Sequence, residues 1–551
     1  MSFNRARLKS SLPRPTIGAP ARGNGRRGPE EPAEPAEPPA PMRPPAQAER
    51  SALIRERVAT RTVTSKRRLQ RHGTPLRVLQ QPIQAGMRKV FDLRRLLFVV
   101  GVTAIVLLLP TPEGLSINGH KALALFAFSG LILALEPAPL PIVALLVPIV
   151  QIALGVDDAG GAFEPFGTPV VFLILGSLFL AEALRKHGLT RRLALHAIVR
   201  SGGQFSPLLL ALMAITGGLS MFVLNTATAA VLIPVAITIA QQVPRPEDGR
   251  KALAVLILAI GYSSSIGAIA TIMGSGENAI ASGLLGQLYG FGFVDWMKYG
   301  LPVVLVLIPL AWLLLPRLFA LPRLTIDIEP ARREIERLGG LSGPEREIIA
   351  VLLVSISLWI AGGSIEHMLN LPATLLSSAV IAIGAVAVLS VEKIVDWSDL
   401  KGVNWGVFFV IGAGLTLGDA LEKTGASAWF ANLVAPTFEG LPFFGVLAAL
   451  ILLAFCITQF MNNVPLGAIL APVLITLGQA SGIDPVRLVI PTIFSVALAF
   501  ALPSGSARMI LIAVTGVVSR QEMLRAGVIV GLACSGVVYV FFLVLSQLGM
   551  I

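Results

Sequence analysis

The stretch NTATAAVLIPVAITIAQ, residues 225–241, decides the fold of this chain because it occurs a second time. Residues 463–479 read NVPLGAILAPVLITLGQ, and the asparagine, the proline and the Ile-Thr pair recur after a shift of 238 residues. Upstream, ALRKHG at residues 183–188 is echoed by ALEKTG at residues 420–425. A long internal repeat in an apolar chain is typical of membrane transporters. Such proteins are built from two halves of opposite topology that meet at a site near mid-membrane.

The composition is that of a polytopic membrane protein. Hydrophobic residues make up 54% of the 551 residues and charged residues only 14%, whereas a soluble domain carries about 25% charged residues. Residues 1–95 have a net charge of +14 and the remaining residues −2. An arginine-rich segment before the first apolar stretch favours an N-terminus held in the cytoplasm beside anionic lipid. No aromatic residues are interleaved with these arginines, so we expect no nucleic-acid partner.

Cysteine and histidine usage gives no sign of a disulfide framework or a metal centre. The two cysteines lie in apolar runs, and the five histidines are scattered without metal-ligand spacing. No nucleophile–base pair is apparent either. We therefore expect no catalytic residues, no metal, no cofactor and no enzymatic activity.

The apolar pattern predicts an all-α polytopic membrane protein with about 11 transmembrane helices. Two re-entrant helical hairpins and two broken helices complete its two inverted repeats. The predicted parts are, in order, a disordered cytoplasmic tail rich in Pro, Ala, Arg and Glu (1–48), a basic cytoplasmic segment (49–93), the first helix and inverted repeat 1 (94–320), a cytoplasmic loop (321–346) and inverted repeat 2 (347–551).

The hairpins are predicted from two long uncharged stretches, 204–244 and 440–482. Both flanks of the first stretch are basic, so it should enter and leave on the cytoplasmic face. Two full crossings take about 40 residues and would leave almost nothing for a turn. Each hairpin is followed by an apolar segment with a polar interruption, at 252–289 and 485–518, which predicts a broken helix.

Charges between the predicted spans set the orientation. Basic residues cluster in the tail, in the linker at 186–203, in the loop at 321–346 and near residue 520, whereas the loop at 157–164 is acidic. This positive-inside pattern predicts a multi-pass inner-membrane protein with a cytoplasmic N-terminus and a periplasmic C-terminus.

Four polar interruptions carry the candidate chemistry. They are Leu224–Thr228, Gly274–Asn278, Gln459–Pro465 and Pro503–Arg508. A helix broken inside the membrane frees N–H groups at one half-helix start, which suit anionic substrate oxygens, and carbonyls at the other end, which suit Na⁺. Asn, Ser and Thr side chains add oxygen ligands and donors without a fixed charge.

These residues resemble the divalent-anion/sodium symporters, the sodium-coupled dicarboxylate, citrate and sulfate transporters, over about residues 95–551. In that family each hairpin tip and its broken helix frame a Na⁺ site, and the tips together hold the carboxylates of the substrate. The resemblance implies a homodimer with a scaffold part and a mobile part that moves like an elevator. The implied substrate-binding residues are Asn225, Thr226, Asn462 and Asn463, and the implied Na⁺ ligands are Asn225, Gly274, Asn278, Asn463, Ser504 and Ser506. Arg508, which the family pattern does not supply, is a further candidate substrate-binding residue.

The chain also departs from the family pattern. The serine expected at each tip is replaced by Leu224 and Asn462, and neither broken helix keeps its Pro-Pro pair. Aligning the interruptions sets Glu277 opposite Arg508, and such mid-membrane charges are usually paired or functional. We therefore consider a Glu277–Arg508 ion pair, and the hypothesis that Arg508 replaces a cation or contacts the anion directly.

The sequence favours a secondary active transporter of small, divalent anions, such as di- or tricarboxylates or sulfate, with Na⁺ as the coupling ion. Two alternatives stay open. One is a Na⁺-independent anion exchanger or arsenite-type permease of the same superfamily, and the other is a transporter-derived membrane sensor. The expected partners are the small anion, sodium ions, the lipid bilayer and a second copy of the chain.

Overall fold

The computed structural model describes residues 91–438 and 442–550, which all belong to the second of two compact units, Thr74–Ile551. The predicted tail (1–48) and nearly all of the basic segment (49–93) lie outside the described residues. Within the described part the chain is helical, with one isolated bridge between Gln204 and Thr325 and no strand.

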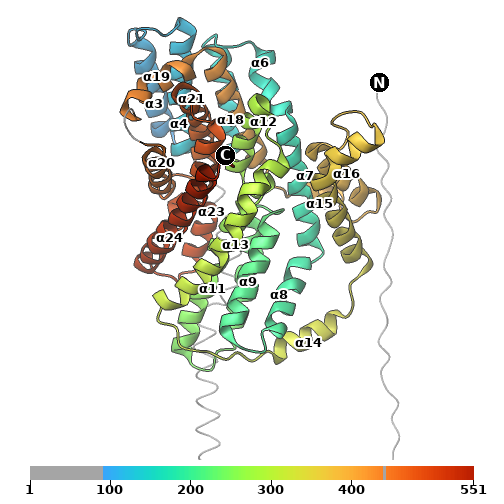
Figure 1. Cartoon of the computed structure of the whole chain (residues 1–551). Coiled ribbons are helices and arrows are strands. Elements are labelled where there is room, and N and C mark those ends of the chain that lie inside the picture. Colours follow the sequence, from blue (N-terminus) through green and yellow to red (C-terminus); the bar gives the residue numbers. More distant parts are fainter. Residues whose placement is uncertain (1–90, 439–441, 551) are drawn as a thin grey trace, which may run out of the picture. The chain divides into compact units, whose positions relative to one another are not determined.

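The first half of the fold runs from α3 to α13 (Figure 1). Its elements are α3 (Leu93–Leu108), α4 (Ile117–Leu135), α5 (Leu140–Ala153), α6 (Ala159–Phe163), η1 (Glu164–Gly167), α7 (Pro169–Lys186), α8 (Leu189–Arg200), α9 (Phe205–Ser220), α10 (Asn225–Ala240), α11 (Pro246–Ala268), η2 (Ile272–Gly274), α12 (Gly276–Tyr289) and α13 (Phe293–Leu318).

The second half follows the linker helix α14 (Glu329–Leu338). Its elements are α15 (Gly343–Leu369), α16 (Ser378–Val391), α17 (Trp397–Leu400), α18 (Trp405–Lys423), α19 (Ala426–Phe438), α20 (Phe443–Thr458), α21 (Asn463–Ser481), α22 (Pro485–Val496), η3 (Pro503–Gly505), α23 (Ala507–Val514) and α24 (Arg520–Gln547).

The sequence repeat corresponds to a repeat of structure. The ALRKHG and ALEKTG segments end α7 and α18, and each closes on a left-handed glycine, Gly188 (φ 69°) and Gly425 (φ 72°). Glycine reaches this conformation without a Cβ clash and therefore commonly ends helices. Figure 1 places α8 toward one end of this unit and its counterpart α19 toward the other, as inverted repeats require.

The linkers are arranged as the charge pattern predicts. The basic helix α8 and the arginine-containing helix α14 lie at one end, and α6, which follows Asp157 and Asp158, lies at the opposite end (Figure 1). The two linkers are tied together, because Arg192 of α8 forms an ion pair with Glu345 (2.8 Å) and donates to the carbonyl of Gly339. Which end faces the cytoplasm stays a prediction.

Helix lengths bear on the span count. Seven described helices are long and apolar enough to cross a membrane, or eight if the α6–η1 and α7 pair, bent by 45°, is one span. The arms α9, α10 and α20 have 16 residues each. Sixteen residues span about 24 Å, less than the ~30 Å hydrocarbon core. The short arms suit re-entrant hairpins, and the count of about 11 spans remains a prediction.

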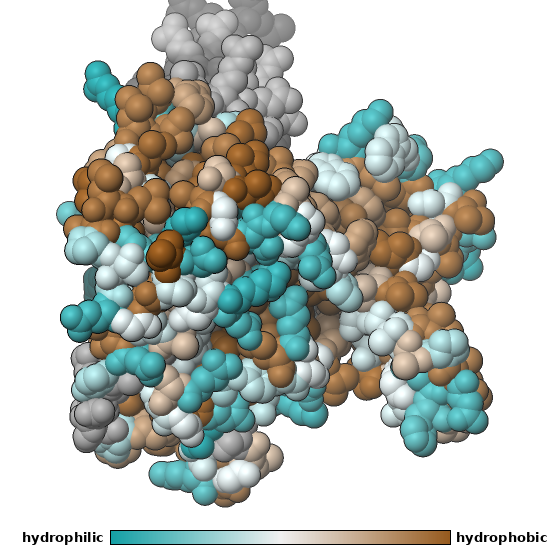
Figure 2. Space-filling model, turned by 90° about the horizontal axis from the view of Figure 1, so that it is seen from above, coloured by the Kyte–Doolittle hydropathy of each residue, from teal (hydrophilic) through white to brown (hydrophobic). Residues whose placement is uncertain are grey.

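The core of this compact unit centres on α11. Pro246 at its first turn and Glu247 with Asp248 beside it start the helix, and 89% of its most apolar window is buried. Tyr262 of α11 stacks on Phe500 with ring centroids 4.2 Å apart, joining the two halves. Exposed large hydrophobic residues instead occur on helices such as α3, α13, α15 and α24, which suits contact with lipid tails. Figure 2, the view from above, shows hydrophilic side chains in the middle of this face and hydrophobic patches toward its edges.

One close approach in this core gives a stability prediction. A Cβ at Gly267 of α11 would lie 2.2 Å from the carbonyl oxygen of Gly217 in α9, whereas a Cβ at Gly218 meets nothing within 4 Å. Gly267→Ala should therefore lower the thermal midpoint of the purified protein strongly, because overpacking costs about 1–3 kcal/mol or more. Gly218→Ala, the matched control, should leave it unchanged or raise it, since alanine favours the helix by about 1 kcal/mol. Equal midpoints for the two variants would contradict this packing.

Candidate functional site

Both hairpin tips end at an asparagine that starts the second arm. Asn225 is the first residue of α10 and Asn463 the first residue of α21, so the sequence repeat places them at equivalent positions. Their surroundings differ. Leu224 precedes Asn225 without a side-chain cap, whereas Asn462 caps α21 by accepting a hydrogen bond from the N–H of Val464 (3.3 Å).

The first hairpin tip is the more open of the two. Asn225 and Thr226 are half-buried, and the Thr226 hydroxyl donates to the side-chain oxygen of Asn225 (3.2 Å). The backbone of the tip is held by its own broken helix, because the Thr271 hydroxyl donates to the carbonyl of Met221. The amide nitrogen of Asn225 keeps its two donors, which an anion could accept.

The first break, between α11 and α12, is held by Asn278. Its side-chain nitrogen donates to the carbonyls of Ala268 (2.8 Å) and Thr271 (2.9 Å). Its side-chain oxygen is fully buried and has no hydrogen-bond partner among the described residues. Gly274 allows the chain to pack back against the end of α11. Any other residue would clash there, because its Cβ would lie 2.3 Å from the carbonyl oxygen of Ala268. A buried amide oxygen without a donor beside a turn of backbone carbonyls fits the oxygen ligands that Na⁺ needs.

The second break, between α22 and α23, repeats this geometry with a different side chain. Ser275 and Ser506 precede α12 and α23 with nearly the same extended backbone, so Ala499 corresponds to Ala268. Here Arg508 makes the contact, since its guanidinium donates to the carbonyls of Ala497 (3.1 Å) and Ala499 (3.3 Å). Arg508 is only 1% exposed. The Arg508 guanidinium thus bonds the carbonyl of Ala499, which corresponds to the Ala268 carbonyl that Asn278 bonds in the first half.

Gln459 joins the second hairpin tip to this second break. Its side-chain oxygen accepts from the N–H groups of Phe500 (3.1 Å) and Ala501 (2.9 Å), and its nitrogen donates to the carbonyl of Phe455 (2.7 Å). Ser504, an exposed residue, donates to the backbone carbonyl of Gln459 (3.1 Å). The tip and the broken helix of this half therefore form one hydrogen-bonded unit.

Asn463 lies between the two halves. Its side-chain nitrogen donates to Glu277 (3.3 Å) of the first half, and its oxygen accepts from the Thr458 hydroxyl (3.0 Å). The contact is close because Gly467 of α21 packs on Glu277, where a Cβ would lie 2.5 Å from that of the glutamate. The first turn of α12 is thereby fixed against the opposite hairpin.

The sequence-predicted residues are thus only partly brought together. No salt bridge between Glu277 and Arg508 is found among the described residues. Asn463 touches Glu277 of the first break rather than the second break that its own half supplies. Ser506 caps α23 through the N–H of Met509 (3.4 Å). Sequence reasoning missed four residues that position the site, all of them small or polar residues in apolar runs: Thr271, Thr458, Gln459 and Gly467.

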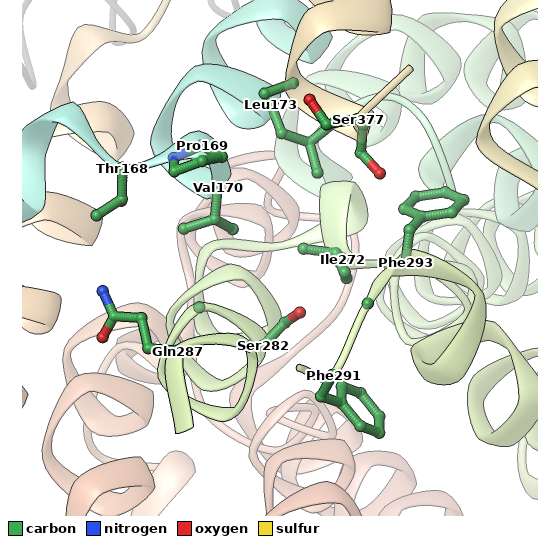
Figure 3. Close-up of a pocket in the computed structure, with 15 residues that line it drawn as sticks. Thr168, Pro169, Val170, Leu173, Ile272, Ser282, Gln287, Phe291, Phe293 and Ser377 are labelled. Carbon is green, nitrogen blue, oxygen red and sulfur yellow. The ribbon is translucent and has the colours of Figure 1, made fainter. Parts of the chain in front are cut away.

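A separate cavity of about 320 Å³ lies beside the first break (Figure 3). Ile272 is the residue of the break that lines this cavity. The other lining residues come from α7, α12, α13 and α16 and from the residues that flank these helices. None of the predicted site residues lines it, so it is distinct from the candidate ion and anion site.

Comparisons with known proteins show the family of this chain. The chain matches the family described as the sodium:sulfate symporter transmembrane region over residues 91–549. It is 32% identical over 439 residues to an uncharacterized transporter of Haemophilus influenzae, covering 77% of this chain and 92% of that protein. It is 28% identical over 478 residues to the sodium-dependent dicarboxylate transporter SdcS of Staphylococcus saprophyticus, covering 82% of this chain and 91% of the relative.

The fold also resembles a solved transporter structure. The Alcanivorax borkumensis YdaH transporter superposes with a TM-score of 0.51 at 14% identity, covering 84% of this chain and 99% of that one, which supports the fold alone. The match to the family spans most of the chain and all of its described repeat. The chain is therefore a multi-pass membrane protein that belongs to the sodium:sulfate symporter family of transporters.

Proposed function

We propose that this protein is a secondary active transporter that moves small divalent anions, dicarboxylates or sulfate, together with Na⁺. The observation that carries the proposal is the buried side-chain oxygen of Asn278 at the first helix break, which has no hydrogen-bond partner among the described residues. A relative described as a sodium-dependent dicarboxylate transporter supports the coupling ion and the substrate class.

The anion is assigned to the hairpin tips. Asn225 and Thr226 offer donors on a half-buried tip. The helix α12 begins without a side-chain cap, and the partial positive charge of its first N–H groups favours an anion. Asn462 and Asn463 lie at the other tip. Asn463 is already bonded to Glu277, so the anion would compete with that carboxylate for the Asn463 amide.

Arg508 supports a second candidate, a Na⁺-independent anion exchanger. Its guanidinium occupies two carbonyls of the second break, a position that a coupling cation would otherwise fill. If Arg508 serves as the cation of the second half, the protein needs fewer ions from solution.

The Na⁺ site of the main proposal lies in the first half. We propose Na⁺ at Gly274 and Asn278, and Arg508 in place of Na⁺ at Ser504 and Ser506 of the second half.

Transport requires one part of the protein to move relative to another. The hairpins, the broken helices, α13 and α24 form the mobile part, and the other helices form a scaffold that pairs with a second copy of the chain. The protein is placed in the inner membrane with its basic end in the cytoplasm. Na⁺ moving down its gradient then draws the anion inward.

Uptake by proteoliposomes tests this function. An inward Na⁺ gradient should drive accumulation of radiolabelled succinate or sulfate, and replacing Na⁺ by K⁺ should abolish it, because the larger K⁺ suits the small oxygen site poorly. The control is anion counterflow without Na⁺. Counterflow that persists at the same rate without Na⁺ would favour the exchanger, and no flux of either anion would contradict both.

A further inference from the structure

The cavity beside the first break is built from four places in the sequence. It is lined by the first turn of α7, by η2 and α12, by the start of α13 and by the start of α16, and it encloses about 320 Å³ (Figure 3). A volume of this order lies at the lower end of ordinary small-molecule sites. The cavity is therefore large enough for a small ligand rather than for water alone.

Most of the cavity wall is apolar. Its walls are made by aliphatic and aromatic side chains, and the close-up shows Ile272 beside Phe291 and Phe293 (Figure 3). The apolar wall residues are Val170, Leu173, Ile272, Phe291 and Phe293. No Asp, Glu, Lys or Arg is among its lining residues. Burial of an apolar group here would be favourable by about 25 cal/mol per Å².

Hydrogen-bond donors that lack partners lie among these apolar side chains (Figure 3). Ser282 of α12 lines the cavity, is only 4% exposed and makes no hydrogen bond through its hydroxyl among the described residues. The N-caps of α7 and α16, Thr168 and Ser377, form no side-chain cap, and the Thr168 hydroxyl donates instead to the carbonyl of Pro165 (2.9 Å). Pro169 has no N–H and the Val171 N–H bonds the carbonyl of Thr168 (3.1 Å). The Val170 N–H of α7 and the first-turn N–H groups of α16 thus keep the partial positive charge of a helix start.

The start of α13 provides a contrast within the same cavity. There the carboxylate of Asp295 accepts from the N–H of Gly292 (2.9 Å), so this helix start is already neutralised. The donors without an anion are those of α7, α16 and Ser282. Donors that lack acceptors, with Ser282 buried and the two helix starts partly exposed, lie among apolar side chains and point to a ligand with a negative head and an apolar body.

We propose that this cavity binds a small amphipathic carboxylate, an apolar chain or ring that ends in a carboxylate group. The carboxylate accepts from Ser282 and from the first turns of α7 and α16, and the apolar part lies against Phe291 and Phe293. Because α7 and α16 pack against each other while α12 and α13 belong to the hairpin part, the bound molecule bridges both. On the proposed function, it would hold the transporter in this conformation and slow transport without competing for the hairpin tips.

Binding is tested with octanoate on the purified full-length protein, by calorimetric titration and by the shift of the thermal midpoint. Octanol lacks the carboxylate and propionate lacks the chain, so both should bind at least about tenfold more weakly, a difference of about 1.4 kcal/mol. Equal binding of octanol and octanoate, or no binding of octanoate, overturns the proposal.

Two serine variants locate the site. Ser282→Ala should weaken octanoate binding about fivefold, a difference of about 1 kcal/mol, because the carboxylate loses one hydrogen bond that water replaces in part. Ser535→Ala is the matched control, since Ser535 of α24 is likewise 4% exposed and without a partner but lies outside the cavity. Equal loss in both variants, or in neither, contradicts the assignment.

Transport provides a readout that separates this inference from the proposed function. Octanoate should lower the maximal rate of succinate or sulfate counterflow and leave the KM unchanged, and Ser282→Ala should relieve the inhibition. A rise in KM alone would place octanoate at the hairpin tips and overturn the proposal. If neither anion is transported, the proposed function fails, whereas the binding measurements still decide on the cavity.

Discussion

Replacing Arg508 with alanine is expected to increase the number of Na⁺ ions coupled to each anion. The Hill coefficient for Na⁺ should rise from about one to about two, and uptake at low Na⁺ should fall about tenfold or more. The reason is that the guanidinium lies on the carbonyls of Ala497 and Ala499. Without it the buried carbonyl of Ala499 loses its donor, at a cost of about 1–3 kcal/mol, and the carbonyl of Ala497 keeps only the Ser265 hydroxyl, until a second Na⁺ binds there.

The Na⁺ dependence of succinate or sulfate uptake, measured with a fixed anion concentration, checks this expectation. Arg508→Lys keeps a positive charge and should keep a Hill coefficient near one. Arg525→Ala removes an exposed arginine from α24 in the same half and should behave like the wild type. If Arg508→Ala leaves both uptake and its Na⁺ dependence unchanged, the view that this residue replaces a cation is wrong.

Asn278→Ala should have the second largest effect, a loss of Na⁺ affinity of about tenfold or more, equivalent to about 1.4 kcal/mol. The variant removes the buried oxygen proposed to bind Na⁺, and it also removes the donors to Ala268 and Thr271. Because these donors hold the break in shape, the maximal rate should fall as well. The concentration of Na⁺ that gives half-maximal uptake is the quantity to measure.

Asn404→Ala is the control for this variant. Asn404 accepts from the N–H of Gly406 (3.2 Å) as an exposed helix cap, so its loss tests the general cost of removing a helix-end asparagine. The thermal midpoints of both variants show whether each still folds. Wild-type Na⁺ affinity in a folded Asn278→Ala protein would remove the first Na⁺ site from the account.

Much of the fold could be predicted because the sequence contains an internal repeat. The repeated asparagines mark the start of α10 and α21, and the polar interruptions coincide with η2 and η3. Such features depend on the local sequence, because Gly, Pro and Ser interrupt a helix whatever the surrounding tertiary structure. The repeat also places Glu277 and Arg508 at equivalent positions, as their nearly identical preceding serine caps show.

The contacts within the site could not be predicted in this way. Each charge packs against other elements instead of its counterpart, Glu277 on Asn463 and Gly467 and Arg508 on carbonyls of its own half. These neighbours depend on how the halves cross, which no local pattern encodes. Gln459 is a polar residue in an apolar run, but three of the four backbone groups that it bonds, those of Leu498, Phe500 and Ala501, lie about 40 residues away in the chain. Sequence alone cannot show that such a side chain is already fully engaged.

The central claim is that two hairpin tips from opposite faces bind one anion, and thiol labelling tests it most directly. In a background with Cys456→Ser and Cys534→Ala, Asn225→Cys and Asn463→Cys are introduced singly and treated with a membrane-impermeant thiol reagent from either side. The account predicts that succinate or sulfate with Na⁺ slows labelling at both positions, and that the two sides differ in access to them. Labelling that the anions leave unchanged at either position would contradict it.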